Sequence, residues 1–100
     1  MAATADPLAQ CREDIDRVDA VLVALLGERT RLAIRVGRLK MAAGQPLTAP
    51  AREAAVLARV RQLAGHPLGP DAVTRIFQRI IDETRATERE AIEERARARR

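Results

Sequence analysis

Apolar residues along the first half of the chain recur at steps of three and four positions, which is the spacing of one face of an α-helix. No proline interrupts this stretch between Pro7 and Pro46. Asp6 can cap a helix N-terminus, and proline suits the first helical position. The pattern predicts one long helix over residues 7–43, preceded by a loose tail at residues 1–6. Its apolar stripe contains Leu8, Ile15, Val18, Leu22, Leu25, Leu26, Ala33 and Val36.

Two further helices are predicted after a glycine- and proline-containing turn. The second covers about 51–64, and the third begins at Pro70 and continues to about Arg95. The basic segment 96–100 is expected to be a fraying tail. No alternating pattern typical of strands competes, so we expect an all-α fold with one helical domain at 7–95.

The length of the first helix has a consequence for assembly. A helix of about 37 residues spans roughly 55 Å, whereas a compact chain of 100 residues has a radius of gyration of about 13 Å. The other two helices are too short to cover its apolar stripe. We therefore expect an intertwined homodimer in which a second copy buries that stripe.

Composition narrows the function classes. Apolar residues make up 47% of the chain, which is too many for a disordered protein. The single cysteine and single histidine, Cys11 and His66, leave no disulfide framework and no metal site, and suit a reducing, cytoplasmic location. One aromatic residue, Phe77, disfavours nucleic-acid recognition by base stacking. No apolar run approaches the roughly 20 residues of a membrane span, and the N-terminus does not resemble a signal peptide.

Three of the 18 basic residues interrupt the apolar stripe of the first helix: Arg12, Arg29 and Lys40. Burying a cation without a partner is costly. These side chains either reach out to water, pair with carboxylates across the dimer, or bind a ligand. Lys40 is the only lysine beside seventeen arginines, which indicates a position where a compact point charge is needed.

The other two helices add polar groups of their own. Thr84 and Glu88 extend the apolar stripe of the third helix, where partial burial would raise the pKa of the carboxyl group. The alternative is a simple salt bridge from Glu88 to an inward-facing cation. Arg52 and Glu53 open the second helix, and the helix dipole explains the glutamate but not the arginine. The alternative to a role for Arg52 in a site is that it is an ordinary surface arginine.

Together these residues carry surplus positive charge, which an anionic small molecule with two carboxylates would balance. Arg12 and Arg29 are about 25 Å apart along the helix, so they converge only if Arg12 comes from an antiparallel second copy. No motif for a covalent nucleophile, a phosphate loop or a metal is present. The residues therefore indicate a cofactor-free site that works by electrostatics.

Five segments in order resemble one known family, the all-helical chorismate mutases, which are small intertwined dimers of the shikimate pathway. The resemblance runs from about Leu8 to Glu90 and implies conversion of chorismate to prephenate by a Claisen rearrangement without a covalent enzyme intermediate. The segments are CREDIDRVD at 11–19, LLGER at 25–29, VGRLK at 36–40, PARE at 50–53 and IFQRIIDET at 76–84.

The resemblance also implies roles for the interrupting residues. Arg12 of the partner copy and Arg29 would bind the substrate carboxylates. Lys40 would hydrogen-bond the ether oxygen of the breaking bond. Glu88 stands where the family usually has glutamine, and only a protonated glutamate can donate to that oxygen.

Further roles follow from the same resemblance. Arg52 and Thr84 would help hold carboxylates, and Glu53 would contact the ring hydroxyl. Ala49 stands where many members have aspartate near that hydroxyl, so a backbone N–H is the donor left there.

Alternatives stay open at this point. The loss of the aspartate admits 4-amino-4-deoxychorismate as a substrate, and an isochorismate-pyruvate lyase would use nearly the same cations. The chain could also be a non-catalytic helical dimerisation module or a basic protein that binds nucleic acid. The nucleic-acid-binding protein would carry its cations clustered outward. No fused dehydratase, dehydrogenase or regulatory domain is expected.

Overall fold

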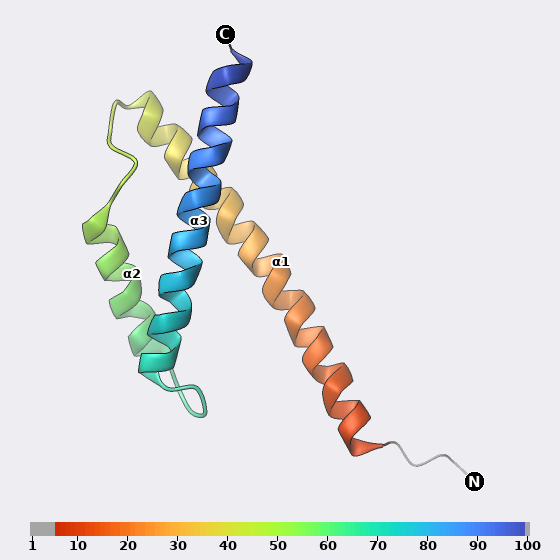
Figure 1. Ribbon diagram of the computed structural model, residues 1–100. Coiled ribbons are helices and arrows are strands. Elements are labelled where there is room, and N and C mark those ends of the chain that lie inside the picture. The colour runs from red at the N-terminus through yellow and green to blue at the C-terminus, as the bar shows by residue number, and fades with distance from the viewer. Residues whose placement is uncertain (1–5, 100) are drawn as a thin grey trace.

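The computed structural model describes residues 6–99 and consists of three α-helices (Figure 1). They are α1 (Pro7–Ala42), α2 (Pro50–Leu63) and α3 (Pro70–Ala98). Each helix carries a proline at its start, where the missing N–H is not needed. Asp6 caps α1, its side chain accepting a hydrogen bond of 3.0 Å from the backbone N–H of Leu8. The predicted all-α class is confirmed.

The predicted helix ends are close to the observed ones, with one larger difference. The structure ends α1 one residue before the predicted residue 43, and α2 begins and ends one residue earlier than predicted. The third helix does not end near Arg95 but continues to Ala98. Alanine and arginine are strong helix formers, and arginines in the last turn interact favourably with the helix dipole. Of the predicted tails, residues 1–5 and 100 lie outside the described part of the chain.

The third helix holds the fold together. It packs against both α1 and α2, whereas in the described chain the backbones of α1 and α2 do not approach each other closely. Figure 1 shows α3 crossing the C-terminal half of α1, while the N-terminal half of α1 extends away from the other helices. The described chain measures 67 × 33 × 15 Å, with a radius of gyration of 18.7 Å. That exceeds the roughly 13 Å of a compact chain of this length.

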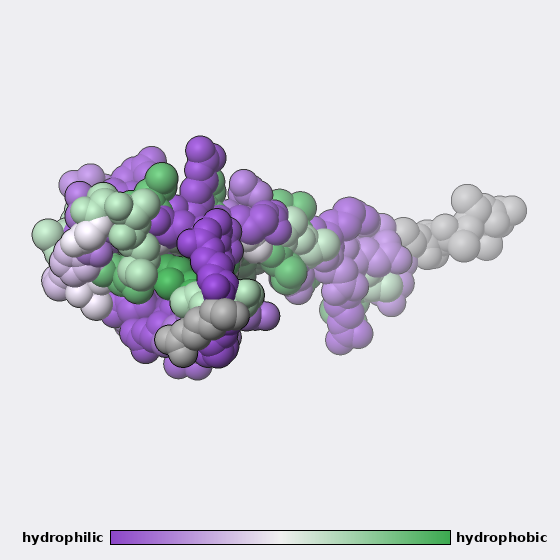
Figure 2. Space-filling view, turned by 90° about the horizontal axis from the view of Figure 1, so that it is seen from above, coloured by the Kyte–Doolittle hydropathy of each residue, from purple (hydrophilic) through white to green (hydrophobic). Residues whose placement is uncertain are grey.

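This open shape leaves much apolar surface uncovered. Among the described residues, the buried apolar side chains are Val60 and Ile81, on α2 and α3. In Figure 2 the extended arm of α1 shows hydrophobic patches among hydrophilic residues. No helix in the described residues is long and apolar enough to cross a membrane. The exposed apolar residues of α1 include Leu8, Ile15, Val18, Leu22, Leu25, Leu32, Val36 and Leu39.

Candidate active site

A cavity of about 330 Å³ lies where α1, α2 and the loop between them face α3. Its volume is within the range of small-molecule sites. Apolar walls come from all three helices and include Val36, Val56 and Ile81. The cavity brings together all but one of the predicted site residues, namely Arg29, Lys40, Ala49, Arg52, Glu53, Thr84 and Glu88.

Arg29 and Thr84 meet where α1 crosses α3. The Nη1 atom of Arg29 donates a long hydrogen bond of 3.5 Å to Oγ1 of Thr84. Thr84 is only 8% exposed and is the buried polar residue of the described chain. Because this one long bond uses little of the guanidinium group's five-donor capacity, Arg29 can still bind a carboxylate in the cavity.

Lys40 lies near the end of α1 and is half-buried. Its Nζ atom donates a hydrogen bond of 3.3 Å to the backbone carbonyl of Leu47, in the loop before α2. This contact ties the ammonium group to the cavity wall. An ammonium group has three donors, so two remain for a ligand.

Glu88 faces Lys40 from α3. Partial burial raises the pKa of its carboxyl group, and the positive charges of Lys40 and Arg85 oppose that rise without cancelling it. The direction agrees with the one expected from its position on the apolar stripe. The raised pKa favours the neutral form, which can donate a hydrogen bond.

Arg85 is a cavity residue that the sequence reasoning missed. It forms an ion pair with Glu53 of α2, and both side chains are partly buried. Arg85 precedes Glu88 by three positions, so the two share one face of α3. That spacing was the available signal, but the pairing with Glu53 depends on how α2 packs against α3.

Gly37 is the second residue that was missed. It is buried where α3 crosses α1, and a Cβ atom placed on it would lie 2.5 Å from Oε1 of Glu88. The same Cβ would lie 2.8 Å from Cδ1 of Ile92. The missing side chain lets Glu88 lie against the backbone of α1, close to Lys40.

The remaining predicted residues differ in position. Arg52 lines the cavity but is exposed, and Ala49 lies in the loop immediately before α2. Arg12 is exposed on the uncovered half of α1 and does not line the cavity. Seventeen residues, about 25 Å of helix, separate it from Arg29.

The charges of the cavity are unbalanced. Four cationic side chains (Arg29, Lys40, Arg52 and Arg85) face the two carboxyl groups of Glu53 and Glu88. The surplus is two positive charges when both carboxyl groups are ionised, and larger when Glu88 is neutral. A dianion of metabolite size would balance this surplus, with apolar walls around its body.

Comparisons with known proteins agree on one family. The model of the family "Chorismate mutase type II" matches residues 11–89. The chain is 36% identical over 90 residues to a bifunctional chorismate mutase/prephenate dehydratase of Escherichia coli, covering 89% of this chain but only 23% of that protein. It is 32% identical over 90 residues to a chorismate mutase of Methanocaldococcus jannaschii, covering 91% of that protein. The chain thus spans about a quarter of the bifunctional relative and most of the shorter one.

Solved structures show the same fold. Form II of the chorismate mutase of Thermus thermophilus superposes with a TM-score of 0.81 at 28% identity, covering 84% of this chain and 96% of that one. The chorismate mutase of Helicobacter pylori in complex with prephenate has a TM-score of 0.79 at 26% identity, with coverages of 87% and 94%. By its matched sequence and its fold, the chain belongs to the chorismate mutase type II family.

Proposed function

We propose that this protein is a chorismate mutase, which rearranges chorismate to prephenate in aromatic amino acid biosynthesis. The observation that carries the proposal is the convergence of Arg29, Lys40, Arg52 and Glu88 on one cavity with two surplus positive charges. Chorismate and prephenate are dicarboxylates with a carbocyclic body, which matches that charge and the apolar walls. A relative of similar fold was solved with prephenate bound.

The reaction breaks the ether C–O bond of chorismate while a new C–C bond forms in the same molecule. It needs no nucleophile, leaving group or cofactor. Negative charge develops on the ether oxygen as the bond breaks, so fixed donors aimed at that oxygen lower the barrier. Holding the reactive chair-like conformer supplies a further contribution by orientation.

Two groups of the cavity suit the ether oxygen. Lys40 has free donors after its bond to Leu47, and Glu88 can donate when protonated, which its raised pKa favours. Arg29 suits a substrate carboxylate because its planar fork binds carboxylates bidentately. Thr84, bonded to Arg29, helps to hold the same carboxylate.

Arg52 suits a second carboxylate from the exposed edge of the cavity. An α2 variant pair tests this role. We expect Arg52→Gln to lower kcat/KM for chorismate. Arg59→Gln, at another exposed arginine of α2 that does not line the cavity, should leave kcat/KM unchanged. Equal effects of the two substitutions would contradict a specific role for Arg52.

A homodimer with Arg12 contributed across the interface is part of the proposal. Its support is the uncovered apolar face of α1, on which Arg12 lies. An antiparallel second copy of α1 would cover that face and bring the partner's Arg12 toward the cavity. A cytoplasmic location is also proposed, supported by the single free cysteine.

Substrate choice rests on the end of the cavity near Ala49 and Glu53. The ion pair with Arg85 engages the carboxylate of Glu53, so this carboxylate offers little attraction to the ammonium group of 4-amino-4-deoxychorismate. The proposal therefore favours chorismate over its 4-amino analogue.

The decisive experiment incubates the full chain separately with chorismate, isochorismate and 4-amino-4-deoxychorismate and separates the products by chromatography. We expect the highest kcat/KM for chorismate, with prephenate formed. Lys40→Ala should lower kcat by about 10²–10³, the usual cost of one oxyanion donor, without changing the helical circular dichroism. Release of pyruvate from isochorismate at a higher kcat/KM would assign a lyase, and no turnover by the folded protein would overturn the proposal.

A further inference from the structure

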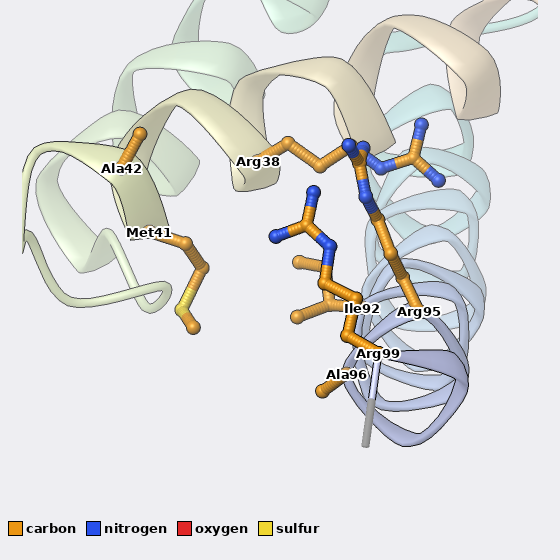
Figure 3. A pocket seen from close by; sticks show the side chains of 7 residues that line it. All are labelled: Arg38, Met41, Ala42, Ile92, Arg95, Ala96 and Arg99. Carbon is orange, nitrogen blue, oxygen red and sulfur yellow. The ribbon is translucent and has the colours of Figure 1, made fainter.

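A second cavity lies outside the candidate active site, between the C-terminal ends of α1 and α3. Its volume is about 370 Å³, and it shares no lining residue with the first. Figure 3 shows Met41 reaching into this space from α1, with Ile92 and Ala96 on the α3 side and three guanidinium groups gathered beside them. The lining residues are Arg38, Met41, Ala42, Ile92, Arg95, Ala96 and Arg99, which we call the terminal cleft.

The three arginines of the terminal cleft have no ionic partner within the described chain. Some arginines on the same helices do, since Arg31 pairs with Glu28 and Arg79 with Glu83. Others outside the cleft, such as Arg35 and Arg89, also lack an ion pair within the described chain. No carboxylate of the described residues lines the terminal cleft. Its residues therefore place three like charges, all on exposed side chains, beside an apolar floor. An anion bound there would relieve their mutual repulsion.

The helix dipole does not account for this arrangement. The C-terminal end of α3 favours cations, but it favours Arg97 as much as Arg95 and Arg99. Arg97 does not line the terminal cleft. Arg38 comes from a different helix. The dipole explains a basic helix end, not the gathering of three arginines from two helices around one apolar hollow.

We propose that the terminal cleft binds a small organic anion in which carboxylate groups are attached to an apolar body. Arginine pairs bidentately with carboxylates, and the floor of Met41, Ile92 and Ala96 covers apolar surface. Inorganic anions and nucleic-acid phosphates would use the arginines but leave that floor exposed to water. The inference is independent of the proposed catalytic activity.

A bound ligand would bridge the ends of α1 and α3. Ile92 also approaches Gly37 at the crossing of the two helices, beside Glu88. A ligand in the terminal cleft would therefore lie beside the active site without entering it. A ligand there would stabilise the crossing and raise the melting temperature of the protein.

The chain offers a sharp probe of this site, because its two methionines are Met1 and Met41. Full-length protein labelled with ¹³C at the methionine methyl groups is titrated with benzylsuccinate, a dicarboxylate with a phenyl group. We expect a saturable shift of the Met41 methyl signal through the ring current. Succinate has the two carboxylates but no phenyl group, and 3-phenylpropanol has the phenyl group but no carboxylate. Each should bind at least about tenfold more weakly than benzylsuccinate.

Variants separate the terminal cleft from general basic character and from the active site. We expect Arg95→Gln and Arg99→Gln each to weaken the Met41 titration by about fivefold or more, since each removes a charge-assisted bond. Arg97→Gln, on the same helix end but outside the cleft, should leave the titration unchanged, as should Arg29→Ala in the active site.

Several outcomes would overturn the proposal. These are no Met41 shift with benzylsuccinate, equal binding of succinate or inorganic phosphate, or equal weakening by Arg97→Gln. A Met41 signal that responds to protein concentration but not to benzylsuccinate would assign the cleft to a second copy of the chain and would also overturn it. Circular dichroism of each variant checks that the fold is intact.

Discussion

Adding a single methyl group at Gly37 should impair catalysis and still leave the protein folded. Ordinary van der Waals contact of a Cβ atom begins at 3.4 Å, but a Cβ on Gly37 would lie 2.5 Å from Oε1 of Glu88 and 2.8 Å from Cδ1 of Ile92. In Gly37→Ala the carboxyl oxygen must therefore retreat by nearly one ångström and the methyl group by more than half of one. The carboxyl group moves relative to Lys40, its neighbour in the cavity.

The destabilising and stabilising contributions of Gly37→Ala to the free energy of unfolding partly cancel. Nothing offsets its effect on catalysis. Overpacking costs about 1–3 kcal/mol, and replacing a helical glycine by alanine returns about 0.5–1 kcal/mol. The free energy of unfolding should therefore fall by about 0–2.5 kcal/mol. A misplacement of about 1 Å at a catalytic group can cost about 10²-fold in rate. We expect kcat to fall by that order, with KM little changed, because the atoms nearest to the added Cβ belong to Glu88 and Ile92 and not to Arg29 or Arg52.

Gly27→Ala is the matched control on the same helix. The nearest atom to a Cβ there is Nη1 of Arg31, at an ordinary 3.6 Å. This variant should be more stable by about 0.5–1 kcal/mol and keep the wild-type kcat. Steady-state kinetics and urea unfolding measure both effects. Wild-type kcat in folded Gly37→Ala, or an equal loss in Gly27→Ala, would refute the reasoning.

Three further predictions concern the site. The activity of the wild type should fall as the pH rises through the raised pKa of Glu88, because only the protonated carboxyl group donates a hydrogen bond. Glu88→Gln should abolish this decline. Identical pH–rate profiles of the wild type and Glu88→Gln would contradict the prediction. Arg85→Gln removes a charge that lowers the pKa of Glu88, so the decline should move to higher pH, and an unchanged midpoint would count against the assignment. Mixing inactive Arg12→Ala and Lys40→Ala homodimers should restore up to about a quarter of wild-type activity, because half of randomly exchanged dimers are mixed and carry one intact site. No recovery after verified subunit exchange would exclude the shared site.

The helices could be predicted from the sequence because their signals are local. Apolar spacing, a capping aspartate and prolines at the starts are properties of short segments, and they placed both ends of α1 and α2 within one residue. The end of α3 was less predictable. A segment of alternating arginine and alanine after two glutamates has no apolar stripe, but its helix propensity and the interaction of its arginines with the helix dipole extend the helix to Ala98.

The candidate site was predictable to the extent that its residues break a local pattern. Arg29, Lys40 and Glu88 interrupt apolar stripes and therefore stand out without any knowledge of packing. Arg85 and Gly37 break no such pattern. Arg85 matters because it pairs with Glu53 on another helix, and Gly37 matters because α3 crosses α1 at that position. Both could be recognised only from the tertiary structure.

The uncovered apolar face of α1 and the position of Arg12 have one common explanation. A chain whose described apolar side chains are buried only at Val60 and Ile81 has little core to stabilise it alone. A second copy laid antiparallel along α1 would bury that face and, in the same step, bring a further cation to each dianion site. Folding and completion of the site would then depend on the same contact. Activity per chain should therefore decline on dilution together with helicity, rather than before it.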